Sequence, residues 1–132
     1  MRGGRIEIDL DAHTMDYVVV PRGRYLCRVA EVRCGTNRAG AERWALRLVV
    51  AEGSHVGKQA AWDSLVFSPQ GLPRIRIVFA ALGLPASGKV QVGPEDLEGR
   101  LAKVDIHIAD FSTPSGEVIR RNQVPYDGFA PP

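Results

Sequence analysis

Arginine is the side chain whose chemistry and spacing stand out in this sequence. Seven arginines lie between residues 22 and 47, against two acids, Glu31 and Glu42, which leaves a local excess of five positive charges. Fourteen of the seventeen basic residues in the whole chain are arginines. A guanidinium group can pair with a phosphate and can also stack on a base. This stretch therefore predicts contact with a nucleic acid, and a solvated strand face without a ligand remains the alternative.

Strand periodicity indicates which of these arginines point outward. In the segment 42–53 the apolar side chains from Trp44 to Val50 recur at every second position, which places them on one buried face. Arg43 and Arg47 must then lie on the opposite face. We therefore predict that Trp44 is a core residue and that Arg43 and Arg47 are the best candidates for phosphate contacts.

Trp62 has a flat ring on which a base can stack. The ring lies outside if Ala61 and Leu65 face inward. The same phase turns Asp63 toward the core, where a carboxylate is costly unless it is paired. The sequence therefore leaves the exposed and the buried interpretation of Trp62 open.

Further candidates lie on the first and fifth predicted strands and in the turns. Because adjacent residues on a strand point in opposite directions, at most one of Arg120 and Arg121 faces any one surface. Phe111 is expected in the loop between the fourth and fifth strands. The complete set predicted to contact nucleic acid is Arg28, Arg33, Arg38, Arg43, Arg47, Lys58, Trp62, Phe111, Arg120 and Arg121.

Five strands and one helix are predicted to position these side chains. Alternating apolar and polar residues indicate strands at 24–34, 42–53, 58–67, 100–110 and 117–125. The alternation slips once near Ala30, which indicates a β-bulge.

The helix is predicted between the third and fourth strands. Ser68 is predicted as its N-cap, Pro69 as its first residue, and Gly83 is placed to end it. Its apolar stripe consists of Leu72, Ile75, Phe79 and Leu82. Such a stripe can be buried on one side only, which suits a helix that covers the end of a barrel. A short helical turn is expected at 95–97.

Three strands, a helix and two strands thus follow one another along the chain. This order is typical of the five-stranded antiparallel barrel called the oligonucleotide-binding fold, an all-β fold with one helix. A β-sandwich fits less well, because it needs about seven strands and leaves the helix without a place. We predict a lead-in at 1–20, one barrel domain at 21–126 and a C-terminal tail at 127–132.

Composition limits the class of protein further. With 132 residues, 45% of them hydrophobic, the chain is long enough for one domain with one core. No apolar stretch approaches about 20 residues and the first residues lack the apolar middle of a signal peptide, so we expect a cytoplasmic protein without membrane contact. Cys27 and Cys34 would lie about 23 Å apart on an extended strand, too far for a disulfide, and are expected to be buried thiols.

Several stretches, taken in this order, resemble one family: IEIDLDA, VVPRGRYLCRV, TNRAGAERWALRLVVAEG, GKQAAWDSLVF, a helix ending in LGLP, DLEGR and RRNQVPYDGF. The family consists of small phage and prophage proteins classed as single-stranded-DNA-binding proteins with an oligonucleotide-binding fold, often catalogued as a domain of unknown function. The resemblance implies binding of single-stranded DNA as an accessory to DNA recombination or replication, with recombination or replication proteins as further partners. The chain ends in YDGFAPP, so the acidic partner-recruiting tail of bacterial housekeeping single-strand binders is not expected here.

Catalytic chemistry is not indicated by the sequence. A nucleophile needs a positioned base and a metal needs clustered ligands, whereas His13, His55 and His107 lie in unrelated contexts. We therefore expect a binding protein that is not an enzyme and that uses no cofactor or metal. The competing hypothesis is a protein-interaction or assembly module on the same barrel without a nucleic-acid ligand. The oligomeric state and the choice between DNA and RNA stay open.

Overall fold

The computed structural model describes residues 4–5 and 14–132. The predicted lead-in stretch IEIDLDA and His13 lie outside the described residues. The strands are β1 Thr14–Asp16, β2 Gly23–Thr36, β3 Glu42–Val50, β4 Gln59–Phe67, β5 Leu101–Ser112, β6 Val118–Gln123 and β7 Phe129–Ala130. The helices are α1 Leu72–Leu82 and the short α2 Pro94–Leu97. The fold is therefore mostly β, and the predicted order of three strands, a helix and two strands is confirmed for β2 to β6 with α1.

One seven-stranded sheet contains all of these strands. Its order is β1-β6-β5-β2-β3-β4, and β7 pairs with β5. The five long strands pair antiparallel, whereas β1 pairs parallel with β6. Strand β4 approaches β6, but no ladder joins these two strands within the described part of the chain. The sheet is therefore mixed and open, and the predicted closed antiparallel barrel of five strands is not confirmed.

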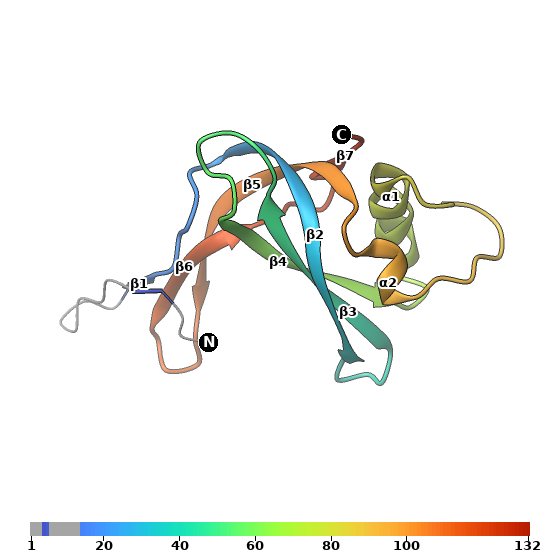
Figure 1. The fold of residues 1–132 in the computed structure, drawn as a ribbon. Helices are drawn as coiled ribbons and strands as arrows, with labels where there is room; N and C mark the ends of the chain where they lie inside the picture. Colours follow the sequence, from blue (N-terminus) through green and yellow to red (C-terminus); the bar gives the residue numbers. More distant parts are fainter. Residues whose placement is uncertain (1–3, 6–13) are drawn as a thin grey trace.

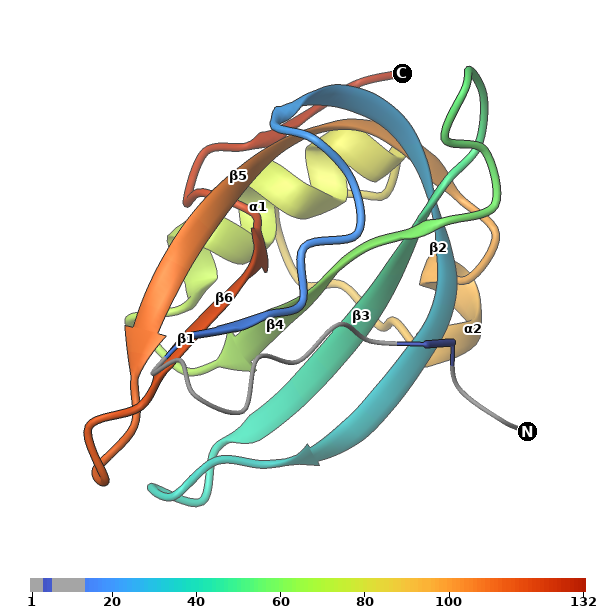
Figure 2. The same cartoon turned by 90° about the vertical axis from the view of Figure 1, so that its left-hand side faces the viewer.

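The helices lie at the opposite side of the molecule from one end of the sheet (Figure 1). Helices α1 and α2 lie at one side of the sheet, and β1 with the β5–β6 hairpin lies at the other. The tips of the β2–β3 and β5–β6 hairpins, residues 37–41 and 113–117, project from the same end of the molecule in both views (Figures 1 and 2). No helix among the described residues is long and apolar enough to cross a membrane.

The predicted bulge is present in β2. The register with β3 shifts between Val29 and Glu31, so one extra residue, Ala30, is accommodated there. Cys27 and Val29 point into the core before the bulge, and Val32 packs against the core after it. The extra residue therefore switches the inward-facing positions from odd to even numbers while the strand stays paired.

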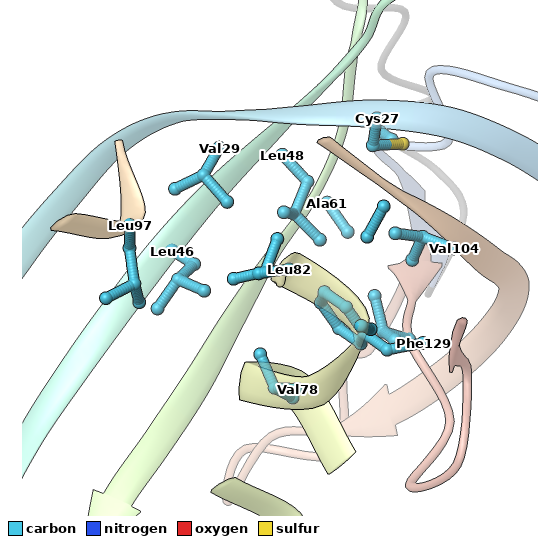
Figure 3. Close-up of a cluster of buried hydrophobic side chains, with 14 of the residues drawn as sticks. Cys27, Val29, Leu46, Leu48, Ala61, Val78, Leu82, Leu97, Val104 and Phe129 are labelled. Carbon is cyan, nitrogen blue, oxygen red and sulfur yellow. The ribbon is translucent and has the colours of Figure 1, made fainter. Parts of the chain in front are cut away.

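The core lies between the concave face of the sheet and the helices (Figure 3). Side chains of β2, β3, β4, α1, α2, β5 and β7 point toward one another there. The prediction that Trp44 is a core residue is confirmed, and its ring packs against that of Phe67 with 4.7 Å between the centroids. Leu46, Leu48, Leu65, Leu97 and Ile106 are among the fully buried side chains.

The predicted start of the helix is wrong, while its end is confirmed. Helix α1 begins at Leu72 with Gly71 as N-cap, because a helix that included Pro69 would bring the ring of Pro73 against the carbonyl of Pro69. Glycine is required at the cap, since a Cβ on Gly71 would collide with the carbonyl oxygen of Val66. At the other end Gly83 adopts φ 79°, the left-handed conformation that ends a helix.

Leu72 is also misplaced in the predicted apolar stripe. It is 46% exposed, whereas Ile75, Phe79 and Leu82 are buried as predicted. Val78 is a further buried residue on the same face. The short helical turn predicted at 95–97 is present as α2.

The C-terminal segment belongs to the sheet. Strand β6 ends at Gln123, earlier than predicted, and residues 127–132, predicted as a tail, contain β7, which pairs with Lys103 and Val104 of β5. Phe129 of β7 is only 6% exposed and lies in the core (Figure 3). This segment therefore contributes to stability as the main strands do.

Replacing Phe129 with Ala tests this contribution. We expect Phe129→Ala to lower the free energy of unfolding by about 3 kcal/mol, because it leaves a cavity beside α1 and β5. Val56→Ala in the exposed turn before β4 is the control, with an expected change within about 0.5 kcal/mol. Urea denaturation measures both, and equal midpoints for the two variants would contradict the assignment of Phe129 to the core.

Candidate nucleic-acid interface

A cleft of about 570 Å³ lies where β4 and β6 approach without pairing. We call it the β4–β6 cleft. Its lining consists of Tyr17, Val19, Arg43, residues 59–64, Arg74, Phe111, residues 121–124 and Tyr126. Strand β4 presents an edge to this space, since it pairs with β3 alone among the described strands, whereas β6 pairs with both β1 and β5.

Arg74 of α1 connects the two sides of the cleft. Its Nη2 donates to Oδ2 of Asp63 at 2.7 Å, its Nη1 donates to the carbonyl of Ser64 at 3.1 Å, and its Nε donates to the carbonyl of Tyr126 at 3.2 Å. The guanidinium group also lies over the ring of Phe129. One side chain thus ties β4 to the segment after β6, where a closed barrel would have a ladder.

The same contact explains how Asp63 is tolerated on the inward side of β4. The side chains of Asp63 and Arg74 are only 12% and 14% exposed. Burial raises the pKa of Asp63, and the charge and hydrogen bond of Arg74 oppose that rise. The carboxylate therefore depends on Arg74 for its ionised state, and the outward position of Trp62 follows from this pairing.

Four aromatic rings line the β4–β6 cleft. Trp62 is 36% exposed, so its exposed interpretation is confirmed. The guanidinium of Arg33 lies 4.6 Å from the centroid of the Trp62 ring system, and that of Arg121 lies 4.0 Å from the centroid of Phe111. Tyr17 and Tyr126 supply two further exposed rings. Guanidinium groups and flat rings therefore occur together.

The outer surface of β2, β3 and β4 continues from this cleft. Residues that are partners on the ladders share a face, and they form the rows Glu31–Arg47–Trp62, Arg33–Ala45–Ser64 and Gly35–Arg43–Val66. We call this surface the arginine face. A hollow of about 310 Å³ on it is lined by Arg33, Cys34, Arg43, Ala45 and Trp62, among others. Because Arg43 and Trp62 also line the β4–β6 cleft, the two form one continuous surface.

The arginines on this surface differ in how far their charge is compensated. Arg33 and Arg47 both pair with Glu31. Arg43 instead donates to the hydroxyl of Ser64 at 2.7 and 3.1 Å. Within the described part of the chain, neither Arg43 nor Arg121 takes part in a salt bridge. These two guanidinium groups therefore have the charge most available to an anion.

Four of the remaining predicted residues lie outside the cleft. Arg28 on β2, Arg38 in the β2–β3 turn and Lys58 before β4 are exposed but do not line it. Arg120 pairs with Asp110 at 2.9 Å and points away from the side of Arg121, as expected for neighbours on a strand. Phe111 lies in β5, not in a loop as predicted, because β5 extends to Ser112 in its ladder with β6.

Sequence reasoning missed the contribution of the N-terminal segment. The backbone N–H of Tyr17 donates to the carbonyl of Arg120 at 2.7 Å. Asn122, buried in β6, accepts from the N–H groups of Val19 and Val20 and donates to the carbonyl of Val20. This side-chain clamp brings Tyr17 to the cleft. The valine run before Pro21 was the only local signal of a paired segment.

A second hollow, of about 790 Å³, lies between α1 and residues 85–92. Its charged lining residues are Glu42 and Arg76, and the rest of its lining is largely apolar. The β4–β6 cleft instead has Arg43 and Arg121 in addition to the mutually compensated pair of Asp63 and Arg74. The excess positive charge therefore favours the β4–β6 cleft as the site for an anionic ligand.

No family model matches this chain, and no curated protein matches it either. The resemblance to the phage and prophage proteins therefore stays a prediction. Among the described residues, no group of three or more His, Cys, Asp or Glu side chains could hold a metal ion.

Removing Arg74 tests the tie across the cleft. We expect Arg74→Met to lower the free energy of unfolding by about 3 kcal/mol or more at pH 7, because Asp63 is left buried and unpaired. The variant raises the pKa of Asp63 further, so ionisation costs folding energy as the pH rises above about 3.9, the unfolded value. The deficit is therefore largest at neutral pH and shrinks in acid. Urea denaturation at several pH values measures it.

Arg76→Met is the matched control for that experiment. Arg76 lies on the same helix and is exposed, so we expect a change within about 0.5 kcal/mol and no added pH dependence. An equal effect of both substitutions would show that Arg74 contributes through the helix alone and not through its contacts across the cleft.

The two cysteines offer a direct check of the surface. Both are free, but the expectation that both are buried is wrong for Cys34, because the end of β2 extends beyond the core. Burial raises the pKa of Cys27 to about 11.

We expect iodoacetamide to modify Cys34 in the folded protein and Cys27 only after unfolding. Peptide mass spectrometry measures this, with Cys34→Ser as the unreactive control, and native modification of Cys27 would contradict the structure.

Proposed function

We propose that this chain binds single-stranded DNA along the arginine face and the β4–β6 cleft, with little sequence preference and without catalysis. The observation that carries this proposal is the gathering of Trp62, Arg43, Phe111 and Arg121 on one continuous open surface. Binding of a single strand needs cationic groups for the phosphates and flat rings for the bases, and each stacked base contributes about 1 to 3 kcal/mol. This surface has both.

The recessed position of the rings favours a single strand over a duplex. Trp62 and Phe111 lie in hollows between strands. Bases inside a duplex are stacked on each other and cannot reach such rings without being unpaired. An unpaired strand has free base faces and a flexible backbone, so its bases can enter the cleft while its phosphates stay near Arg43 and Arg121.

The strand order supports an oligonucleotide-binding architecture. Strands β2 to β6 have the order of that fold, with α1 between the third and fourth strands, and β4 and β6 approach where such a barrel would close. In that fold the ligand crosses the second and third strands between two hairpin loops. The corresponding elements here are β3 and β4 with the tips at 37–41 and 113–117 (Figure 2). The family resemblance further implies that the chain acts as an accessory to DNA recombination or replication.

Titration of a labelled oligothymidylate tests the proposal. We expect Trp62→Ala to weaken binding roughly tenfold or more, because one stacking platform is lost. Arg43→Gln and Arg121→Gln should each lower the slope of log affinity against log salt by about 0.7, since each removes one phosphate contact. Fluorescence anisotropy at several salt concentrations measures both effects.

Two control variants distinguish a loss of affinity caused by the binding surface from one caused by a change of net charge or of folding. Arg76→Gln removes the same charge from α1, outside the cleft, and should leave the affinity nearly unchanged. Trp62→Phe keeps a ring and should lose less than Trp62→Ala. Affinity that ignores salt, or an equal loss for Arg76→Gln and Arg43→Gln, would sink the proposal. Binding of a partner protein that excess oligonucleotide does not displace would instead favour the protein-interaction module.

A further inference from the structure

Glu31 lies on the arginine face and forms ion pairs with two of its arginines, Arg33 and Arg47. Its carboxylate accepts a hydrogen bond from Nε of Arg33 at 2.8 Å and another from Nε of Arg47 at 3.2 Å. The hydrogen bond from Arg33 is the main cause of the lowered pKa of Glu31. Two predicted phosphate ligands are therefore occupied by a carboxylate in the free protein.

The bulge in β2 produces this arrangement. The register shift after Val29 makes Glu31 the direct partner of Arg47 on the ladder, so their side chains lie side by side on the outer face. Arg33 is two residues further along β2 and shares that face. The carboxylate thus reaches one arginine across the ladder and another along its own strand.

Arg33 also covers the ring of Trp62. Its guanidinium lies 4.6 Å from the centroid of the ring system, at the place where a base would stack on that side of the indole. Because Glu31 fixes the orientation of Arg33, it keeps this cation over the ring. The carboxylate therefore restrains Arg33, a predicted phosphate-binding residue, and through it keeps one face of the Trp62 ring covered.

We propose that Glu31 is an internal competitor of the DNA phosphates: it occupies Arg33 and Arg47 in the free protein, and the bound strand replaces it. A carboxylate and a phosphate both accept charge-assisted hydrogen bonds from a guanidinium group. Exposed ion pairs are individually weak, and both pairs of Glu31 are partly exposed. Replacing the carboxylate with a phosphate therefore costs little free energy. Glu31 is a positioning residue that lowers the affinity for the strand, and this role rests on the proposed function.

The decisive variant is Glu31→Gln, which keeps the shape of the side chain and removes its charge. We expect it to bind a labelled oligothymidylate about two- to tenfold more tightly than the wild type at one fixed salt concentration. A merely structural role for Glu31 would give the opposite sign, because damage to the face weakens binding. In a background with Arg33→Gln and Arg47→Gln the gain should vanish, since Glu31 acts through those two arginines.

Asp105→Asn is the matched control. It also removes one negative charge and releases one arginine, Arg24, from a 2.7 Å ion pair, but it does so on the β2–β5 ladder outside the arginine face. A gain from Glu31→Gln that clearly exceeds that of Asp105→Asn is expected. Equal gains would mean that net charge alone is responsible and would overturn the proposal.

A second measurement needs no DNA. Trp44 is buried and Trp62 is exposed, so quenching of tryptophan fluorescence by neutral acrylamide reports mainly on Trp62. Glu31→Gln should increase quenching, because Arg33 is released from the ring. If the wild type binds DNA through Trp62 but Glu31→Gln neither tightens binding nor increases quenching, this inference fails and the proposed function stands. If neither protein binds the oligonucleotide, both fail.

Discussion

The buried contact of Arg74 with Asp63 is the constraint on which the β4–β6 cleft depends. A closed barrel would join β4 and β6 with a ladder, whereas here one guanidinium group holds Asp63, Ser64 and the backbone of Tyr126. A side chain can bridge a wider gap than a backbone hydrogen bond, so the strands stay connected and the cleft between them stays open. The same pairing compensates Asp63 and thereby fixes the face of β4 on which Trp62 lies. Breaking it would affect stability and the ligand surface together.

The bulge in β2 has a comparable double effect. One extra residue at Ala30 lets the strand curve around the core while it keeps its ladder with β3. After the bulge the even-numbered residues point inward, so Glu31 and Arg33 share the outer face with Arg43 and Arg47. The bulge thus brings arginines from this part of the sequence onto one surface. The curvature of the sheet requires the same bulge.

Local periodicity explains which features the sequence predicted. The alternation in β3 settled the burial of Trp44 and the outward position of Arg43, because a strand repeats every two residues. The start of α1 was misplaced because alternation does not report on the spacing of Pro69 and Pro73 or on the close approach of Gly71 to the carbonyl of Val66. The exposure of Trp62 stayed open because the partner of Asp63 lies eleven residues away on a helix. Tyr17 reaches the cleft through parallel pairing of β1 with β6, and the valine run before Pro21 indicates a paired segment but not its partner.

The charge count in the sequence overstates what a ligand would meet. Arg33 and Arg47 share Glu31, Arg24 pairs with Asp105 and Arg120 pairs with Asp110, so several of the arginines already have a carboxylate partner inside the fold. Among the guanidinium groups that line the β4–β6 cleft, Arg43 and Arg121 take part in no salt bridge within the described part of the chain, and they lie in the same cleft as the rings of Trp62 and Phe111. A strand bound there would owe a larger share of its affinity to stacking than to phosphate contacts. That balance agrees with a net charge of only +2 for the chain, and under the proposed function it would limit the binding of polyanions that have no unpaired bases.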